Sequence, residues 1–229
     1  MAADVRWLGH SAFHLSGGGA DVLVDPWLTG NPKAAVSADD VPADVIALTH
    51  GHGDHIGDTV AIAKRTGAKV LAIVELGAEI EGDGVSDVVG FNYGGTIKFD
   101  WGWIKMVPAW HTAVSPKGTA HMPAGLLIHY GGHLIYHLGD TALFSDMQLI
   151  ARRGDRVELA LVPIGGHYTM DRYDAVTAVE FINPFQTIPC HYGTFPPVET
   201  DVQAFKQDVQ QAGFSEVLVL NPGDSHKIK

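Results

Sequence analysis

The chain of 229 residues has a single cysteine, Cys190, and few basic side chains. One cysteine excludes an internal disulfide and is typical of a protein from a reducing compartment. No apolar run reaches the roughly 18 residues that a membrane-spanning helix needs. The first residues also lack the layout of a signal peptide. From these absences we expect a cytoplasmic protein that does not cross a membrane.

Basic residues are outnumbered by acidic ones. Lys and Arg number 15 against 26 Asp and Glu, which gives a formal charge of −11. Nucleic acids and anionic membrane surfaces are bound through basic patches, and the sequence has no basic cluster. We therefore expect a small molecule as the partner, and neither nucleic acid nor a membrane. The composition is compatible with a homo-oligomer.

Hydrophobic residues make up 46% of the chain, enough for a substantial core. Without a repeat, a low-complexity segment or a linker, the sequence predicts one α/β domain over residues 1–229. The main strands are predicted at Val5–Leu8, Ala12–Leu15, Asp21–Val24, Asp44–Thr49, Lys69–Val74, Trp103–Trp110, Gly125–Tyr130, His133–Leu138, Glu158–Pro163, Phe185–Cys190 and Glu216–Leu220, with edge strands at Ser86–Val89 and Thr96–Phe99. Helices are predicted at Asp58–Arg65, Glu75–Glu81, Leu143–Arg152, Asp171–Ile182 and Asp201–Ala212, and a short tail follows Asn221–Gly223.

Histidine is abundant, with 13 residues in the chain. Three of them and one aspartate lie within the six residues His50-Gly51-His52-Gly53-Asp54-His55, between a predicted strand and a predicted helix. The glycines allow a tight backbone that turns the neighbouring side chains onto one centre. Neutral imidazole and carboxylate suit zinc, iron, nickel and manganese. The segment therefore predicts a metal site, and a polar surface loop that happens to be rich in histidine is the weaker alternative.

Other polar residues come just after the ends of predicted strands. In layered α/β folds, ligands collect at the carboxyl edge of the strands. One such residue means little, but seven predict a shared site. They are His10, Asp25, His50, His111, Asp140, His167 and His191.

This set resembles the metallo-β-lactamase superfamily, whose signature is a His-x-His-x-Asp-His loop followed in order by a lone His, a lone Asp and a final His. The closer likeness is to the UlaG-like, UPF0173-type metal-dependent hydrolases, and it covers nearly the whole chain. The resemblance implies a four-layer αββα sandwich with metals at one edge. It is carried by Trp7–Ser11, Asp25–Trp27, Thr49–Gly57, Gly139–Thr141, Pro163–Gly166 and His191–Phe195, with His111 as the lone histidine.

Transferred to this chain, the resemblance implies two divalent metal ions, whether zinc, manganese, nickel or iron. One metal would take His50, His52 and His111. The other would take Asp54, His55 and His191, with Asp140 bridging the two. Seven ligands suffice for two metals that share one carboxylate, and they leave positions open for water.

These features predict a metal-dependent hydrolase. A hydroxide held by the two metals would attack a small ester, lactone or phosphodiester, and Asp54 would orient it. The positive charge of the metals allows an anionic substrate group. Two alternatives remain open: a mononuclear-iron oxidoreductase of the same superfamily, and a non-catalytic metal-binding protein. One iron per chain favours the first alternative, whereas two metals per chain favour hydrolysis.

Several residues outside the ligand set have predicted roles. His167 is predicted as a catalytic proton donor or a group that faces the substrate. Asp25 either orients a ligand imidazole or caps a turn, and His10 lies either beside the metals or in the core. Cys190 is expected to point away from the neighbouring His191, as a small buried residue. Three further histidines are expected to be satisfied structural residues: His129, His133 and His137.

Two loops, Pro26–Pro42 and Thr112–Pro123, flank ligand segments. Long loops without regular structure are usually functional, so one or both of them, together with His121 and His167, are expected to line the mouth of the metal pocket. Trp27 and Trp110 lie at the bases of the loops. They either form apolar walls for a small ligand or fill the core beneath the loops.

Overall fold

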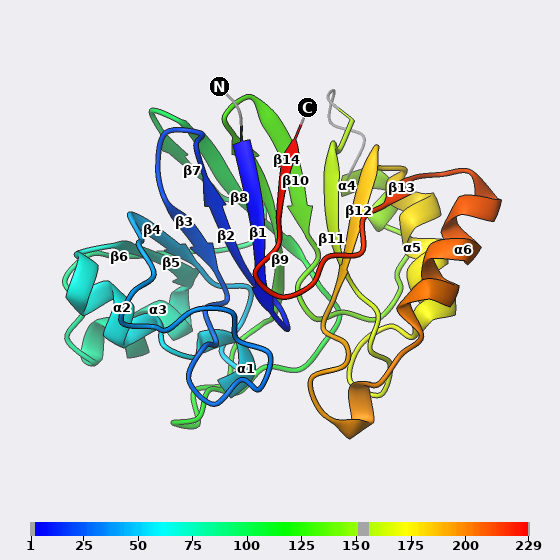
Figure 1. Cartoon of the computed structure of the whole chain (residues 1–229). Helices are drawn as coiled ribbons and strands as arrows, with labels where there is room; N and C mark the ends of the chain where they lie inside the picture. The colour runs from blue at the N-terminus through cyan, green and yellow to red at the C-terminus, as the bar shows by residue number, and fades with distance from the viewer. Residues whose placement is uncertain (1–2, 151–155, 229) are drawn as a thin grey trace.

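The computed structural model describes residues 3–150 and 156–228. In this part of the chain, two seven-stranded sheets pack between outer helices (Figure 1). The first sheet contains, in spatial order, β14 (Ser225–Ile228), β1 (Ala3–Gly9), β2 (Ala12–Ser16), β3 (Val22–Val24), β4 (Val45–Ala47), β5 (Lys69–Ile73) and β6 (Val88–Phe91). The second contains β13 (Glu216–Val217), β12 (Gln186–Cys190), β11 (Leu159–Pro163), β10 (His133–His137), β9 (Ala124–Tyr130), β8 (Gly102–Pro108) and β7 (Thr96–Phe99).

The helices form the two outer layers. Beside the first sheet lie α2 (Thr59–Thr66) and α3 (Val74–Gly82), and beside the second lie α4 (Met147–Ile150), α5 (Arg172–Ile182) and α6 (Val202–Ala212) (Figure 1). Helix α5 starts after Asp171, whose side chain caps the helix by accepting hydrogen bonds from the first-turn N–H groups of Tyr173 and Asp174. The predicted αββα sandwich is confirmed.

Two apolar cores hold the layers together. Strand β11 shows both, because successive side chains of a strand point to opposite faces. Leu159 and Leu161 pack in the core between the two sheets, whereas Ala160 and Val162 pack in the core beneath α5 and α6. All four side chains are fully buried. A continuous apolar run is therefore what this central strand requires.

The strand directions bring the polar strand ends to one edge. Strands β1 and β3 each pair antiparallel with β2, so they run the same way, and β4 is parallel to β3. In the second sheet, β8 and β10 likewise flank β9, and β11 and β12 are parallel to β10. Two hydrogen bonds join the sheets at their carboxyl ends: His191 N–H to His10 O (3.0 Å) and Ala124 N–H to Thr49 O (2.9 Å).

Three predicted elements differ from the structure. The C-terminal tail, expected to be irregular, forms β14 and pairs with β1. In the described residues, the helix predicted at Leu143–Arg152 is only α4, because Ser145 and Asp146 favour a helix start there; residues 151–155 lie outside the described part. The strand predicted at Trp103–Trp110 ends at Pro108, which has no N–H to donate.

The remaining differences are small. The strand predicted at Glu216–Leu220 pairs only over β13. Strands β6 and β7 are edge strands as predicted, but they belong to different sheets. Among the described helices, none is long and apolar enough to cross a membrane.

Candidate metal centre

The histidine-rich segment lies between β4 and α2 and contains the short helix α1 (Gly53–Ile56). Gly57 ends this helix with a φ of 37°. A Cβ at Gly57 would collide with the Pro26 carbonyl and the Trp27 backbone, so only glycine fits where α1 packs on the loop after β3. This close packing fixes the segment, and hence its side chains, against the end of β3.

All seven residues predicted as metal ligands meet at the carboxyl edge of the sheets. Their ligand atoms form three overlapping groups, and within each group these atoms lie within 4.8 Å of one another. The groups are His50, His52 and His111; His50, His55 and Asp140; and Asp54, His55 and His191 joined by His10. Both sheets contribute side chains to the centre, so neither the motif nor the later residues can form it alone.

Asp140 lies between the histidines of the other groups. Its Oδ2 atom is 3.1 Å from His191 Nε2, 3.3 Å from His55 Nε2 and 3.6 Å from His111 Nε2. The Asp140 side chain is almost completely buried. One carboxylate thus reaches residues of both predicted metal subsites, as a bridging ligand must.

A hydrogen-bond network around Asp25 fixes two of the imidazoles. Asp25 accepts from Thr49 N–H (2.8 Å), from the Thr49 hydroxyl (2.6 Å) and from His55 Nδ1 (2.8 Å). Because the one hydroxyl proton of Thr49 goes to Asp25, the 3.1 Å contact between Thr49 Oγ1 and His50 Nδ1 is donated by the imidazole. His50 and His55 both carry a proton on Nδ1, which leaves Nε2 directed at the centre. The network gives Asp25 the predicted role of orienting a candidate ligand.

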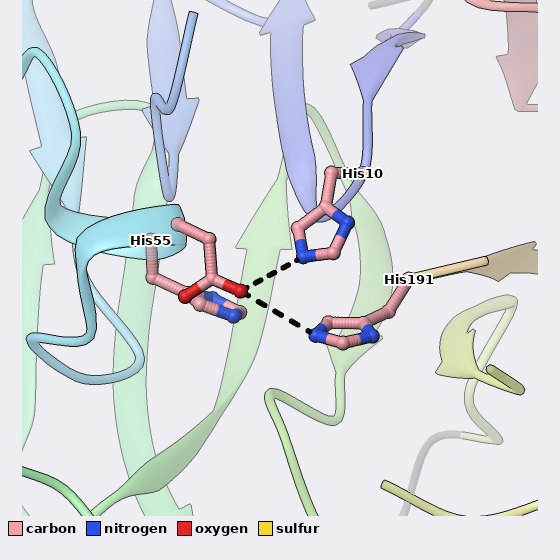
Figure 2. Close-up of side chains that lie close together, drawn as sticks. His10, His55 and His191 are labelled. Atoms are coloured by element: carbon pink, nitrogen blue, oxygen red, sulfur yellow. Dashed lines mark hydrogen bonds and ion pairs between the residues drawn. The ribbon is translucent and has the colours of Figure 1, made fainter. Parts of the chain in front are cut away.

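His10 performs a similar role for Asp54. The imidazole of His10 is fully buried, and its Nε2 lies 3.2 Å from Asp54 Oδ2. Burial, the largest influence, lowers the pKa of His10 to about 4, so the ring is neutral and Nε2–H donates to the carboxylate. Nδ1 then accepts from the Thr194 hydroxyl at 2.9 Å. Figure 2 shows His10, His55 and His191 converging from three different elements.

Several buried polar atoms at the centre have no hydrogen-bond partner. They are His55 Nε2, Asp140 Oδ1, and both Nδ1 and Nε2 of His191, and the two Nε2 atoms share only the ion-pair contact with Asp140 Oδ2. A buried polar group without a partner costs about 1–3 kcal/mol, so a native fold rarely leaves several together. A cation at this position would give the Nε2 atoms of His55 and His191 and the Asp140 carboxylate a common partner. The residues present therefore fit a bound metal.

Burial also sets the charge of the histidine group at the first predicted subsite. It lowers the pKa of His50 well below the usual value, and it lowers the pKa of His52 and of His111. These imidazoles are neutral at neutral pH. Neutral imidazole is the form that ligates metals.

The second predicted subsite carries more charge. Burial alone would raise the pKa of Asp140, but the neighbouring His191 and His55 hold it well below its usual value. Burial would likewise raise the pKa of Asp54. The hydrogen bond from His10 and the charge of His55 outweigh burial, so the pKa of Asp54 is lowered. Burial opposes the charged form of His55, but Asp140 and Asp25 raise its pKa well above the usual value. Without a metal, His55 is therefore a cation between two carboxylates.

The backbone at the strand ends adopts an uncommon conformation. Four non-glycine residues there have positive φ: His10 (55°), Asp25 (46°), His167 (55°) and His191 (53°). The only other non-glycine case in the described residues, Asn183, ends helix α5, where this conformation is usual. Such backbone costs about 1–3 kcal/mol per residue and clusters at functional sites. Four of the seven strand-end residues noted in the sequence share this feature.

A cavity of about 440 Å³ opens onto the centre. The sequence did not indicate Tyr168 or Phe195 as part of it. The signal was present, since Tyr168 follows His167 and Phe195 ends the segment His191–Phe195. The lining residues are His52, Asp54, His111, Thr112, Asp140, Tyr168, His191 and Phe195.

His167 lies at the rim of the centre. It is exposed, its ring edge contacts Tyr168 (centroids 4.4 Å apart), and it is not among the residues that line the cavity. Its catalytic role stays a prediction. His121 accepts a hydrogen bond from Gly51 N–H (2.8 Å) and donates to Thr119 O (3.0 Å), so it fastens its loop to the histidine-rich segment.

The two tryptophans have different surroundings. Trp110 is 68% exposed, so it does not fill the core. Trp27 is half-buried and meets the His10 ring edge-on, with centroids 5.1 Å apart. Of the loop Thr112–Pro123, Thr112 lines the cavity. The role of the loops in substrate selection stays a prediction.

The remaining predictions concern structural residues. His137 is buried, accepts from Gly139 N–H and donates to Ser11 O, as a satisfied histidine should. His129 is different, because its buried Nδ1 has no hydrogen-bond partner, so the expectation of a satisfied side chain was wrong there. Cys190 is fully buried, as expected.

Several known proteins are similar to this chain in sequence or in fold. The beta-lactamase superfamily domain matches residues 4–191. A UPF0173 metal-dependent hydrolase of Thermus thermophilus is 47% identical over 222 residues, which cover 96% of this chain and 97% of the relative. One from Methanopyrus kandleri is 45% identical over 231 residues, covering 97% and 99%. The structure of Igni18, a metallo hydrolase from Ignicoccus hospitalis, superposes with a TM-score of 0.92 at 36% identity, covering 100% of this chain and 99% of that one.

Proposed function

Since the chain belongs to the UPF0173 metal-dependent hydrolases of the beta-lactamase superfamily, we propose that it hydrolyses its substrate with two divalent metal ions at the candidate centre. The observation that supports this most is the set of partnerless buried atoms on His55, Asp140 and His191. The Nε2 atoms of His55 and His191 share a single protein partner, Asp140 Oδ2, at 3.3 and 3.1 Å. Imidazole nitrogen and carboxylate oxygen are atom types that ligate metals.

The two subsites would divide the candidate ligands by their positions. His50, His52 and His111 would hold one ion, because their nitrogens converge in one group. Asp54, His55 and His191 would hold the other, and Asp140 would contact both. This donor set of imidazole and carboxylate suits zinc, manganese, nickel and iron.

When bound, such a metal pair lowers the pKa of a coordinated water and polarises the bond to be cleaved. The protein positions the reactants. His10 donates to one oxygen of Asp54, which keeps the carboxylate ionised and directed at the cavity, where it can hold and orient the attacking water. Thr112, Tyr168 and Phe195 also line this cavity. His167, beside Tyr168 and outside the cavity lining, is the predicted proton donor or substrate-facing group, and its contribution is tested by substitution.

The proposed substrates are small esters, lactones or phosphodiesters. The test combines metal analysis with turnover. The protein is stripped with chelator and reloaded with Mn, Zn, Ni or Fe, and its metal content per chain is measured by mass spectrometry. Each loaded form is then assayed on all three substrate classes. Two ions per chain with hydrolysis supports the proposal. One iron per chain with oxygen consumption supports the mononuclear oxidoreductase, and bound metal without turnover supports a non-catalytic protein.

A further inference from the structure

One wall of the metal cavity is aromatic. Tyr168, from the loop between β11 and α5, and Phe195, from the loop after β12, both line it. Their ring centroids are 6.4 Å apart and their planes are inclined by 60°, which is an edge-to-face contact. We call these two rings the aromatic wall. The other lining residues are polar, and most are candidate metal ligands.

The aromatic wall is fixed to the metal centre. A Cβ at Gly165 would collide with the carbonyl oxygen of His191, so the loop that carries Tyr168 packs directly on a candidate ligand segment. Phe195 lies on the other side of that segment, with its ring centroid 5.7 Å from the ring of His10. A ligand that touches both rings would therefore be held at a defined position relative to the metals.

The backbone before Tyr168 is strained. His167 has a positive φ of 55°, which is uncommon for a residue other than glycine, whereas Gly166 before it adopts its φ of 66° freely. The Tyr168 N–H then closes back onto the Gly166 carbonyl at 2.6 Å. These turns hold the Tyr168 side chain at the cavity, although the side chain remains 51% exposed. Burial of this ring contributes little to folding, so strain that keeps it in place points to ligand binding.

The charges of the lining residues define the ligand further. Within the described residues, no Lys or Arg lines the cavity. The metal ligands lie on the floor, so a carboxylate or phosphate on a remote part of the substrate would find no cationic side chain to pair with. An alkyl chain or an aryl ring would instead find two aromatic faces. The wall thus favours an uncharged, apolar substrate group.

We propose that the aromatic wall binds the apolar part of a neutral carbonyl substrate, namely an ester or lactone that carries an alkyl chain or aryl ring. This inference rests on the proposed hydrolase function and narrows its substrate class. In the reaction, water adds to the carbonyl carbon, the bond to the alkoxy oxygen breaks, and that oxygen leaves with a proton from the water. The second proton of the water is released to solvent, so the products are a carboxylate, an alcohol and a proton, and no oxidant or other co-reactant is needed.

The substrate test uses matched pairs on the metal-loaded protein. p-Nitrophenyl butyrate and p-nitrophenyl hemisuccinate are similar in length, but only the second has a charged acyl end. We expect kcat/KM for butyrate to exceed that for hemisuccinate by about 10-fold or more, in the range of one apolar pocket contact. It should also rise from acetate to butyrate to hexanoate. Equal rates, or a preference for hemisuccinate or bis(p-nitrophenyl) phosphate, would overturn the proposal.

The variant test separates binding from folding. In Tyr168→Ala and Phe195→Ala, kcat/KM should no longer rise with acyl chain length. We expect KM for the hexanoate ester to increase by about 10-fold, while turnover of the acetate ester changes less. Tyr168→Phe and Phe195→Leu should restore the gain, because they keep an apolar surface. Tyr173→Ala serves as the matched control, since Tyr173 is a 63% exposed tyrosine on α5 outside the cavity. An undiminished chain-length gain in both alanine variants would contradict the assignment.

A third measurement needs no turnover. Alkyl hydroxamic acids from two to eight carbons place a metal-binding head in the centre and a variable chain on the wall. Calorimetry should show affinity rising with chain length in the unaltered protein and staying flat in Tyr168→Ala. If affinity rises but no ester is hydrolysed, the proposed hydrolysis fails and the apolar subsite stands. If esters are hydrolysed but affinity is independent of chain length, the subsite fails and the hydrolase stands.

Discussion

Two buried aspartates, Asp25 and Asp140, follow strands of opposite sheets, but they differ in their surroundings. Asp25 is 0% exposed and Asp140 2%. The oxygens of Asp25 accept three hydrogen bonds from protein groups, two from Thr49 and one from His55. Asp140 Oδ1 has no partner. The first carboxylate is completed by the protein, whereas the second leaves a position that only a ligand can complete.

The site as a whole divides in the same way, into a region whose polar groups are satisfied by the protein and a region whose polar groups are not. Asp25, Thr49, His10 and Thr194 form a supporting network whose contacts are all made within the protein. The metal-ligand region, represented by Asp140 and the candidate ligands around it, contains buried polar atoms that have no hydrogen-bond partner. The supporting network fixes tautomers and carboxylate orientation before a metal arrives. The site is therefore preorganised, which limits the rearrangement needed on metal binding.

The largest expected effect of a substitution belongs to the metal-ligand region. Asp140→Ala removes the carboxylate that lies between both subsites, so metal content should fall below two per chain. We expect hydrolysis to drop by more than about 10³-fold, beyond the range for loss of a single electrostatic contact. Metal analysis and turnover of the reloaded protein check this. Two bound metals with near-normal turnover would show that Asp140 does not bridge.

For stability of the metal-free protein, we expect the opposite order: substitution of Asp25 should destabilise the fold more than substitution of Asp140. In Asp25→Asn, either orientation of the amide places its NH₂ against a donor, so we expect a loss of about 3–5 kcal/mol in the free energy of unfolding, as for other broken buried pairs. In Asp140→Asn, the NH₂ can replace Oδ1, and the amide oxygen can keep the contacts of Oδ2 with His55 and His191, so the charge is lost but no donor is left facing an NH₂ group. Urea unfolding in chelator compares the two isosteric variants. A greater loss for Asp140→Asn would reverse the comparison.

The sequence predicted the metal-ligand region better than the supporting network. The candidate ligands form an ordered pattern of chemically distinctive residues, and strand direction alone brings their positions to one edge. The contact between His10 and Asp54 joins residues 44 positions apart, and no local pattern encodes it. Tyr168 and Phe195 were missed because the sequence does not show where the side chain of an aromatic loop residue points. That direction depends on the backbone conformation of the loop. The C-terminal strand β14 was missed for a similar reason, since only pairing with β1 defines it.

Metal binding should release protons unequally at the two subsites. The imidazoles of His50, His52 and His111 have lowered pKa values and are already neutral at pH 7. His55 has a raised pKa because of Asp140 and Asp25, although burial opposes it, so a metal must displace its proton. We expect about one proton released at the second subsite and almost none at the first. Calorimetry in buffers of different ionisation enthalpy counts these protons.

The raised pKa of His55 also predicts how stability and metal affinity change with pH. The folded pKa of His55 lies above the usual 6.5. The stability from its ion pairs in the metal-free protein is therefore fully present below pH 6.5 and is lost as pH rises through the folded pKa. Affinity at the second subsite should rise over that window, because fewer protons compete. Equal proton release at both subsites would mean that the aspartates do not hold His55 charged.

The smallest expected effect belongs to His167, whose only described contact outside its own backbone is the ring of Tyr168. A catalytic proton donor is typically worth about 10²–10⁴-fold in rate. An exposed imidazole outside the cavity lining should contribute less than about 10-fold, below that range. His167→Asn is the suitable variant, because asparagine tolerates the positive φ of this position and so leaves Tyr168 in place. Measuring kcat for an ester with a poor leaving group and for one with a good leaving group shows whether His167 acts as a proton donor, because only a poor leaving group needs protonation. A loss of 100-fold or more, confined to the poor leaving group, would establish His167 as the proton donor and extend the catalytic machinery to the rim.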